Sequence, residues 1–84
     1  MVSKQLILYV KPGCSWCRKA ENYLREHGYA YEWIDVISDR SAFAEMKHLS
    51  GQTYAPTLAV GDLILADFGP EDLEEFLQQH QILP

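Results

Sequence analysis

The two cysteines of this 84-residue chain, Cys14 and Cys17, are separated only by Ser15 and Trp16. They follow an apolar run at residues 6–10 and a Pro-Gly step, and a helical pattern begins at Ser15. The pair is therefore placed at the start of a helix, where backbone N–H groups lack intrahelical partners and carry partial positive charge. A sulfur held there is stabilised as the thiolate, and the pKa of such a cysteine falls to roughly 3.5–7.5 from about 8.5. The pattern predicts a reactive dithiol.

The two cysteines are not expected to be equivalent. Cys17 falls in line with Ala20 and Leu24 on the core-facing stripe of the predicted helix, which shelters its sulfur. Cys14 precedes the first turn and should reach solvent. We therefore expect Cys14 to attack a substrate disulfide and Cys17 to resolve the resulting mixed disulfide.

Other roles for the cysteine pair are a structural disulfide, a zinc site and two inert thiols. A bridge over two residues closes almost no loop and so stabilises little. Zinc usually takes four protein ligands, and the sequence has no second Cys-x-x-Cys and no paired histidines near the first. Because Cys-x-x-Cys within a βαβ pattern is typical of redox proteins, redox chemistry is favoured and no metal site is expected.

Length and composition indicate one globular domain covering residues 1–84. Hydrophobic residues make up 48% of the chain and charged residues 23%, as in folded proteins. There is no apolar stretch near 18 residues and no signal-peptide core after Met1, so we expect a cytoplasmic protein without a membrane partner. Two cysteines in a reducing compartment are more often catalytic than structural.

The charge is distributed unevenly along the chain. The net charge is −5, which argues against a nucleic-acid partner. Residues 1–25 nevertheless hold five basic residues and one acidic residue, a local charge of +4 against −9 for residues 26–84. Lys11, Arg18 and Lys19 surround the cysteines, where they would favour a thiolate and attract an anionic thiol substrate. The basic residues of the helix could equally form a solvated helix face.

Hydrophobic periodicity and turn residues predict seven elements. In chain order these are a strand at Gln5–Val10, a helix at Ser15–His27, a strand at Tyr31–Val36, a helix at Arg40–Leu49, strands at Leu58–Val60 and Leu63–Leu65, and a helix at Pro70–Gln79. The first two strands should be parallel because a helix connects them. The next two strands should form a hairpin across Gly61-Asp62.

The helix faces follow from the same periodicity. In the second helix, which Ser38 or Asp39 would cap, the inward residues are predicted to be Phe43, Met46 and Leu49. The inner stripe predicted for the last helix consists of Leu73, Phe76 and Leu77.

The element order, with Cys-x-x-Cys at the first helix and a proline ahead of the third strand, resembles the thioredoxin fold. The chain looks most like a glutaredoxin or a glutaredoxin-like protein, on the basis of residues 9–17, Ser50-Gly51, Ala55-Pro56 and residues 68–73. The resemblance implies an α/β thioredoxin fold (β-α-β-α-β-β-α) in which three helices flank a central mixed four-stranded sheet. It also implies a thiol–disulfide oxidoreductase that acts on disulfide-containing proteins.

The resemblance further implies a substrate site around the dithiol. In the family, the proline matching Pro56 follows a cis peptide bond and faces the cysteines, and the backbone of Ala55 would pair with an extended substrate. Lys11 matches the basic residue that meets the glycine carboxylate of glutathione, and Trp16 stands where an aromatic wall flanks the sulfur. Glutathione would then be a co-substrate of a monomer that has no tightly bound cofactor.

The match is weaker at the site for the γ-glutamyl end of glutathione. The family's Gly-Gly is replaced by Ala66-Asp67, so part of the close backbone approach that glycine permits is lost. Asp67 and Phe68 would still present backbone N–H groups to a carboxylate, although the Asp67 side chain could repel one.

Two alternatives remain open, and only the first follows from this departure. One is a glutaredoxin-like electron donor reduced by thioredoxin reductase, in which binding of glutathione is dispensable. The other belongs to a different class, a carrier of a [2Fe–2S] cluster held by Cys14 and glutathione between two protomers. The substitution of the motif proline by Ser15 is the only feature that supports the cluster carrier.

Overall fold

The computed structural model describes residues 5–84. Its elements, in chain order, are β1 (Leu6–Val10), α1 (Ser15–Glu26), β2 (Tyr31–Asp35), α2 (Arg40–Ser50), β3 (Thr57–Val60), β4 (Leu63–Ala66) and α3 (Pro70–Gln79). All seven predicted elements are present, with bounds that differ by one residue at most. The first strand's predicted start at Gln5 lies one residue before its observed start.

The four strands form one mixed sheet in the order β2-β1-β3-β4. Strand β1 pairs in parallel with β2 and antiparallel with β3, and β3 pairs antiparallel with β4. The α1 crossover explains the parallel pair, and the turn at Gly61-Asp62 explains the final hairpin. This arrangement confirms the predicted thioredoxin fold.

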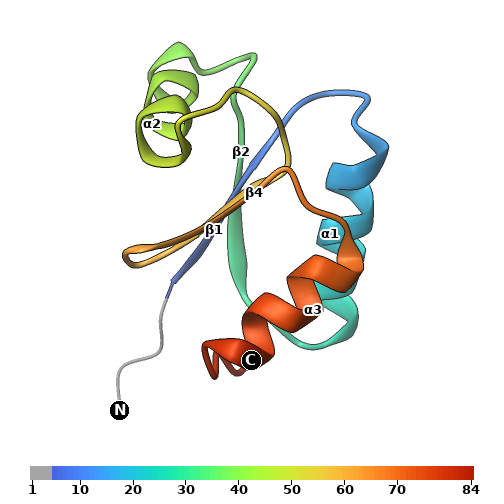
Figure 1. The fold of residues 1–84 in the computed structure, drawn as a ribbon. Helices are drawn as coiled ribbons and strands as arrows, with labels where there is room; N and C mark the ends of the chain where they lie inside the picture. The colour runs from blue at the N-terminus through green and yellow to red at the C-terminus, as the bar shows by residue number, and fades with distance from the viewer. Residues whose placement is uncertain (1–4) are drawn as a thin grey trace.

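The helices cover both faces of the sheet (Figure 1): α1 and α3 lie side by side on one face and α2 lies on the other. Alternation along β1 supplies both cores, because Leu8 points toward α1 and α3 whereas Tyr9 points toward α2. Leu24 and Leu73 are fully buried on the first face, and Met46 is fully buried on the second.

Local signals set the ends of α2. The Asp39 carboxylate accepts a hydrogen bond from the Ala42 N–H at 3.1 Å, and Gly51 ends the helix in the left-handed conformation at φ +71°. The predicted inward position of Leu49 is wrong, since its side chain is 44% exposed. The buried stripe instead follows Ala42 and Met46 at a spacing of four, which leaves Leu49 beside it.

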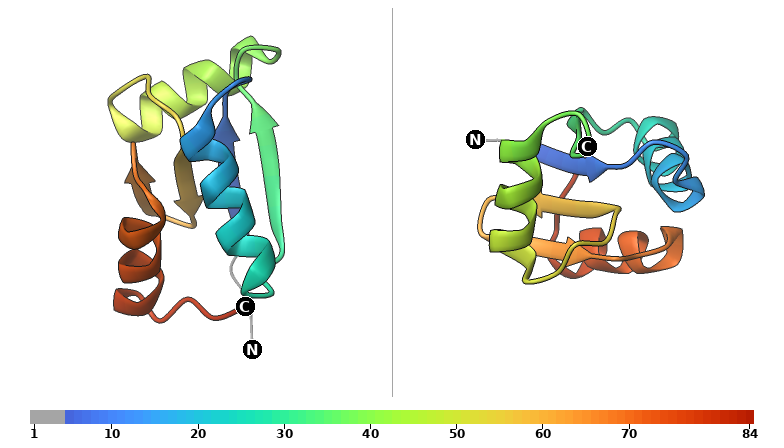
Figure 2. Two further views of the ribbon diagram at one scale, coloured as in Figure 1. Left: turned by 90° about the vertical axis from the view of Figure 1, so that its right-hand side faces the viewer. Right: turned by 90° about the horizontal axis from the view of Figure 1, so that it is seen from above.

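The loops that carry the cysteines and Pro56 lie together at one end of the sheet. Helix α1 begins at this end, and the C-terminus lies at the opposite end of the molecule (Figure 2, left). The loop from Val10 to Ser15 leads out of β1, and residues 51–56 lead into its antiparallel neighbour β3. Among residues 5–84, no helix has the length and apolar character needed to cross a membrane.

Candidate functional site

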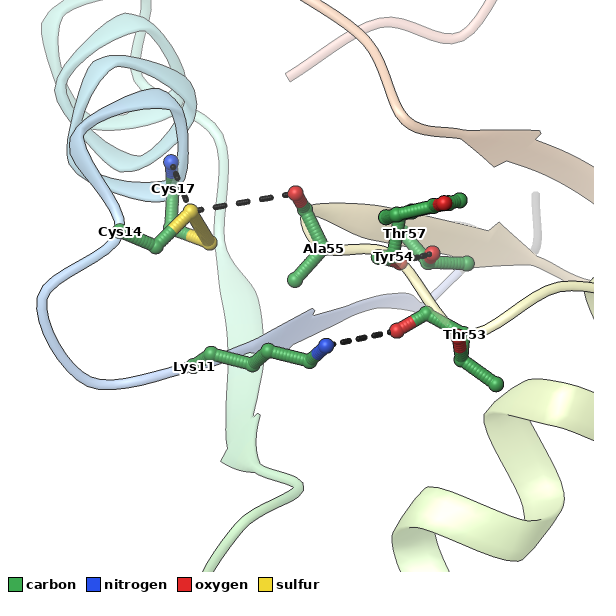
Figure 3. The surroundings of a disulfide bond; sticks show 7 residues. All are labelled: Lys11, Cys14, Cys17, Thr53, Tyr54, Ala55 and Thr57. Atoms are coloured by element: carbon green, nitrogen blue, oxygen red, sulfur yellow. Dashed lines mark hydrogen bonds between the residues drawn. A yellow bond between two sulfur atoms is a disulfide. The ribbon is translucent and has the colours of Figure 1, made fainter.

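Cys14 and Cys17 form a disulfide at the start of α1, with their Cα atoms 5.2 Å apart. Cys14 is the N-cap residue, and the Cys17 N–H donates a hydrogen bond to Cys14 Sγ at 3.1 Å (Figure 3). Cys17 is 2% exposed, whereas Cys14 is only partly buried. The amide donor at the helix terminus favours negative charge on the Cys14 sulfur. The predicted difference in exposure is confirmed, and the roles of attacking and resolving thiol stay predictions.

The loop before β3 places the backbone of Ala55 next to Cys14 Sγ. The Ala55–Pro56 peptide bond is cis, as the family resemblance implied. The Ala55 carbonyl oxygen lies 3.8 Å from Cys14 Sγ (Figure 3). Within residues 5–84 the Ala55 N–H has no backbone hydrogen-bond partner. An extended chain that paired with Ala55 would therefore pass directly beside the reactive sulfur.

A polar network that the sequence did not suggest holds this loop. Thr57 is fully buried, and its hydroxyl donates to the Tyr54 carbonyl oxygen at 2.9 Å. The Gln52 side chain donates to Thr57 Oγ1 at 3.1 Å and accepts from the Tyr54 N–H at 2.6 Å. These bonds fix the backbone on both sides of Ala55. No motif marks Gln52 or Thr57, since each acts through residues that only the folded loop brings close.

Lys11 contacts the same loop. Its ammonium donates a hydrogen bond to the Thr53 carbonyl oxygen at 2.7 Å (Figure 3) and lies 5.7 Å from the centre of the Phe43 ring. Lys11 therefore links the end of β1 to the segment that carries Ala55. A lysine ammonium has three N–H donors, so the predicted contact with a carboxylate stays open as a prediction.

Trp16, in the first turn of α1, packs against Gly69 and Lys19, and its predicted role as a wall beside the sulfur stays a prediction. Its side chain is 51% exposed, and the Lys19 ammonium lies 4.4 Å from the ring centre. A Cβ atom placed on Gly69 would come within 2.9 Å of the Trp16 ring, so only glycine permits this close packing. The sequence did not identify Gly69 as part of the site, because its neighbour Trp16 is more than fifty residues away in the chain.

Trp16 and the start of α3 enclose a cavity of about 410 Å³. We call it the Trp16 cavity; its lining residues are Trp16, Asp67, Phe68, Gly69, Glu71 and Asp72. Both residues predicted for the γ-glutamyl end of glutathione line it.

The backbone donor expected at Asp67 is not free. Asp67 has φ +53°, and its N–H donates to the Pro56 carbonyl oxygen at 2.9 Å. The prediction that this N–H would meet a carboxylate is therefore wrong, because the turn uses it to join the loop of Pro56. The Phe68 side chain is 4% exposed and belongs to the core, so Phe68 can offer a substrate only its backbone.

A second cavity, of about 250 Å³, lies against both cysteines and has a mixed charge. Lys11, Arg18, Glu21 and Asp35 all contribute to its lining. Burial raises the pKa of Asp35, but hydrogen bonds from Ile37 and Ser38 outweigh it and hold that pKa below its usual value. Within residues 5–84, no group of three or more histidine, cysteine or acidic side chains is arranged to hold a metal ion.

The fold and the dithiol together define a thioredoxin-fold thiol–disulfide oxidoreductase. The glutaredoxin family model matches residues 6–64, and the chain belongs to the glutaredoxin family. The Neisseria meningitidis glutaredoxin is 34% identical over 62 residues, which are 73% of each chain. An uncharacterised glutaredoxin-like protein of the Clostridium pasteurianum rubredoxin operon is 25% identical over 86% of this chain and 96% of its own. The crystal structure of the thioredoxin-like protein BC3987 has a TM-score of 0.78 and 26% identity, covering 86% of this chain and 99% of that one.

Proposed function

We propose that this chain reduces protein disulfides and glutathione mixed disulfides through Cys14 and Cys17, with glutathione as co-substrate and no tightly bound cofactor. The observation that carries the proposal is the position of Cys14 Sγ. It accepts the Cys17 N–H at 3.1 Å and lies 3.8 Å from the Ala55 carbonyl oxygen. One sulfur is thus both activated by the helix terminus and adjacent to a backbone edge on which a substrate can align.

The reaction consists of two exchanges of disulfide bonds. The Cys14 thiolate attacks one substrate sulfur, the substrate S–S bond breaks, and the first thiol leaves with a proton from solvent. Cys17 then loses its proton and attacks Cys14 Sγ, which releases the second thiol and forms the Cys14–Cys17 disulfide. Two electrons pass from the dithiol to the substrate. Two molecules of glutathione return the dithiol to its reduced state and leave as glutathione disulfide.

A specific observation favours a second electron donor. The Asp67 N–H donates to the Pro56 carbonyl oxygen, and acidic residues line the Trp16 cavity. A substrate carboxylate therefore has fewer hydrogen-bond donors there than the family pattern implies. A thioredoxin reductase, which would supply electrons by direct dithiol exchange, does not need that contact. We propose it as the alternative donor.

Turnover of a glutathione mixed disulfide, coupled in separate reactions to glutathione reductase and to thioredoxin reductase, tests both proposals. Consumption of NADPH only with glutathione and glutathione reductase supports the first donor, and consumption only with thioredoxin reductase supports the second. The Cys14→Ser variant is the matched control for background thiol exchange. If wild-type turnover equals that of the control in both couplings, the proposed activity is refuted.

A further inference from the structure

In the proposed reaction, Cys17 has to give up a proton from a buried position. Its side chain is 2% exposed and belongs to the core cluster beneath α1. Burial disfavours the thiolate, because a charge in apolar surroundings loses its hydration. A nearby group that accepts the proton would therefore speed the attack of Cys17 on Cys14 Sγ.

The cavity of about 250 Å³ beside the cysteines connects Cys17 to polar groups. We call it the dithiol cavity; it lies between the start of α1 and the edge strand β2. Trp33 and Asp35 of β2 reach it from the α1 face of the sheet, since they pair in register with the core residues Leu8 and Val10. A water molecule takes roughly 30 Å³ in the liquid, so several fit in a polar cavity of this size.

Glu21 is the lining residue best placed to accept the proton. It lies four residues after Cys17 on α1, and side chains at this spacing are neighbours on one helix face, with Cβ atoms about 5–6 Å apart. The Cα–Cβ bonds of a helix tilt toward its N-terminus, so the Glu21 side chain starts in the direction of Cys17. Glu21 is half-buried, and its Oε1 accepts a hydrogen bond from the Tyr31 hydroxyl at 3.0 Å. Among the hydrogen bonds of residues 5–84, Oε2 accepts none.

Tyr31 holds the Glu21 carboxylate in place from β2. Its side chain packs against the core cluster that contains Cys17. Burial, and then the hydrogen bond to Glu21, raises the pKa of Tyr31, and the charge of Arg25 lowers it by less. The hydroxyl therefore stays protonated at neutral pH and keeps donating to Glu21.

The other carboxylate of the dithiol cavity is already occupied. Asp35 Oδ1 accepts the N–H groups of Ile37 and Ser38, and Oδ2 accepts the Ser38 hydroxyl at 3.0 Å. Burial raises the pKa of Asp35, but these bonds outweigh it and hold that pKa below its usual value, which makes Asp35 a weaker proton acceptor. The remaining charged residues of the lining, Lys11 and Arg18, are cations and cannot accept a proton.

We propose that Glu21 accepts the proton of Cys17 in the resolving step, through water in the dithiol cavity, and that Tyr31 is its positioning residue. The inference rests on the proposed dithiol reaction and adds to it the path of one proton. As the proton leaves Cys17 Sγ for Glu21, that sulfur attacks Cys14 Sγ, and the bond from Cys14 Sγ to the substrate sulfur breaks. The released thiolate takes a proton from solvent, and Glu21 later returns its proton to solvent.

The test measures the two exchanges of one turnover separately. Reduced protein is mixed with excess 5,5′-dithiobis(2-nitrobenzoate) in a stopped-flow instrument. Attack by Cys14 releases the first coloured thiol at a rate that depends on the reagent concentration. Attack by Cys17 on the resulting mixed disulfide releases the second coloured thiol at a rate that does not, because the step is intramolecular.

Glu21→Gln keeps an oxygen that can accept from Tyr31 but removes the proton acceptor. General base catalysis contributes roughly 10²–10⁴-fold, and attack by preformed thiolate supplies part of the rate, so at pH 7 the second release should slow by about tenfold relative to the first. The rate of that release in the variant should rise about tenfold for each pH unit, because it then follows the thiolate fraction. The wild-type rate should rise less steeply. Glu21→Asp should recover part of the loss, and Tyr31→Phe should show a smaller loss.

Glu26→Gln is the matched control, since it removes the same charge from an exposed position of α1 outside the cavity. It should keep the wild-type rates and their pH dependence. A second release that Glu21→Gln leaves unchanged, or slows equally at every pH, overturns the inference. Wild-type protein that releases no coloured thiol, or only one per chain, refutes the proposed dithiol reaction instead, so the two failures are distinguishable.

Discussion

Replacing Lys11 by methionine tests whether this residue positions the loop of residues 51–56, which carries Ala55, or only binds substrate. Lys11 donates to the Thr53 carbonyl oxygen at 2.7 Å, two residues before Ala55. A hydrogen bond to a charged group contributes about 1.5–3 kcal/mol when buried, and the partly exposed position of Lys11 reduces this to about 1 kcal/mol. For a domain of this size, that loss lowers Tm by about 4–8 °C.

The catalytic effect of Lys11→Met distinguishes the two roles. If Lys11 holds the loop, the variant should lose about fivefold in kcat/KM toward the neutral bis(2-hydroxyethyl) disulfide as well as toward a glutathione mixed disulfide, since about 1 kcal/mol corresponds to fivefold. If Lys11 serves only a substrate carboxylate, the neutral disulfide should react at the wild-type rate.

Thermal unfolding of the reduced protein and steady-state kinetics with both disulfides provide the measurements. Lys47→Met removes the same charge from an exposed position of α2 and controls for net charge. Lys11→Arg, which keeps a donor, should recover part of both losses. An unchanged Tm, together with a defect confined to the glutathione substrate, would refute a positioning role for Lys11.

Three other predictions concern the core, the cysteines and the alternative function. Burial, and then the hydrogen bond to Glu45, raises the pKa of Tyr9 above its ordinary value of 10.0, so the stability that protonated Tyr9 contributes is present below pH 10 and lost at higher pH. Tyr9→Phe should therefore lower the free energy of unfolding in urea by about 1 kcal/mol at pH 8 and flatten its decline above pH 10; an equally steep decline would contradict this. Cys14→Ser should abolish all activity, whereas Cys17→Ser should keep reduction of glutathione mixed disulfides and lose reduction of protein disulfides; equal losses in both assays of Cys17→Ser would mean that the roles are assigned wrongly. Protein purified anaerobically with glutathione should be colourless, and a brown product with sulfide-to-iron absorption would instead support the [2Fe–2S] carrier.

Much of the fold could be predicted from the sequence because its signals are local. Three features depend only on residues within a few positions of one another. They are the position of Cys14 before the first helical turn, the cap at Asp39, and the buried stripe of Leu73, Phe76 and Leu77. Such signals depend on backbone geometry and on the side-chain period, which act before distant parts of the chain meet.

The family resemblance extended the prediction to the loop of residues 51–56. The spacing of residues in the sequence does not indicate that this loop lies beside Cys14. Ala55 is 41 residues from Cys14, and no periodicity relates the two positions. The resemblance implied that they meet, and the structure adds the 3.8 Å distance and the network of Gln52 and Thr57 that holds the loop.

The sequence by itself determined which atoms can react and where the helices and strands begin. Only the tertiary structure decided which backbone groups remain available around them. When the sheet and helices assemble, the Asp67 N–H meets Pro56, the Lys11 ammonium meets Thr53, and Trp16 packs against Gly69. A backbone or side-chain N–H that donates to one acceptor is no longer available to a substrate. Which acceptor it meets depends on chain segments that lie far apart until the sheet has formed.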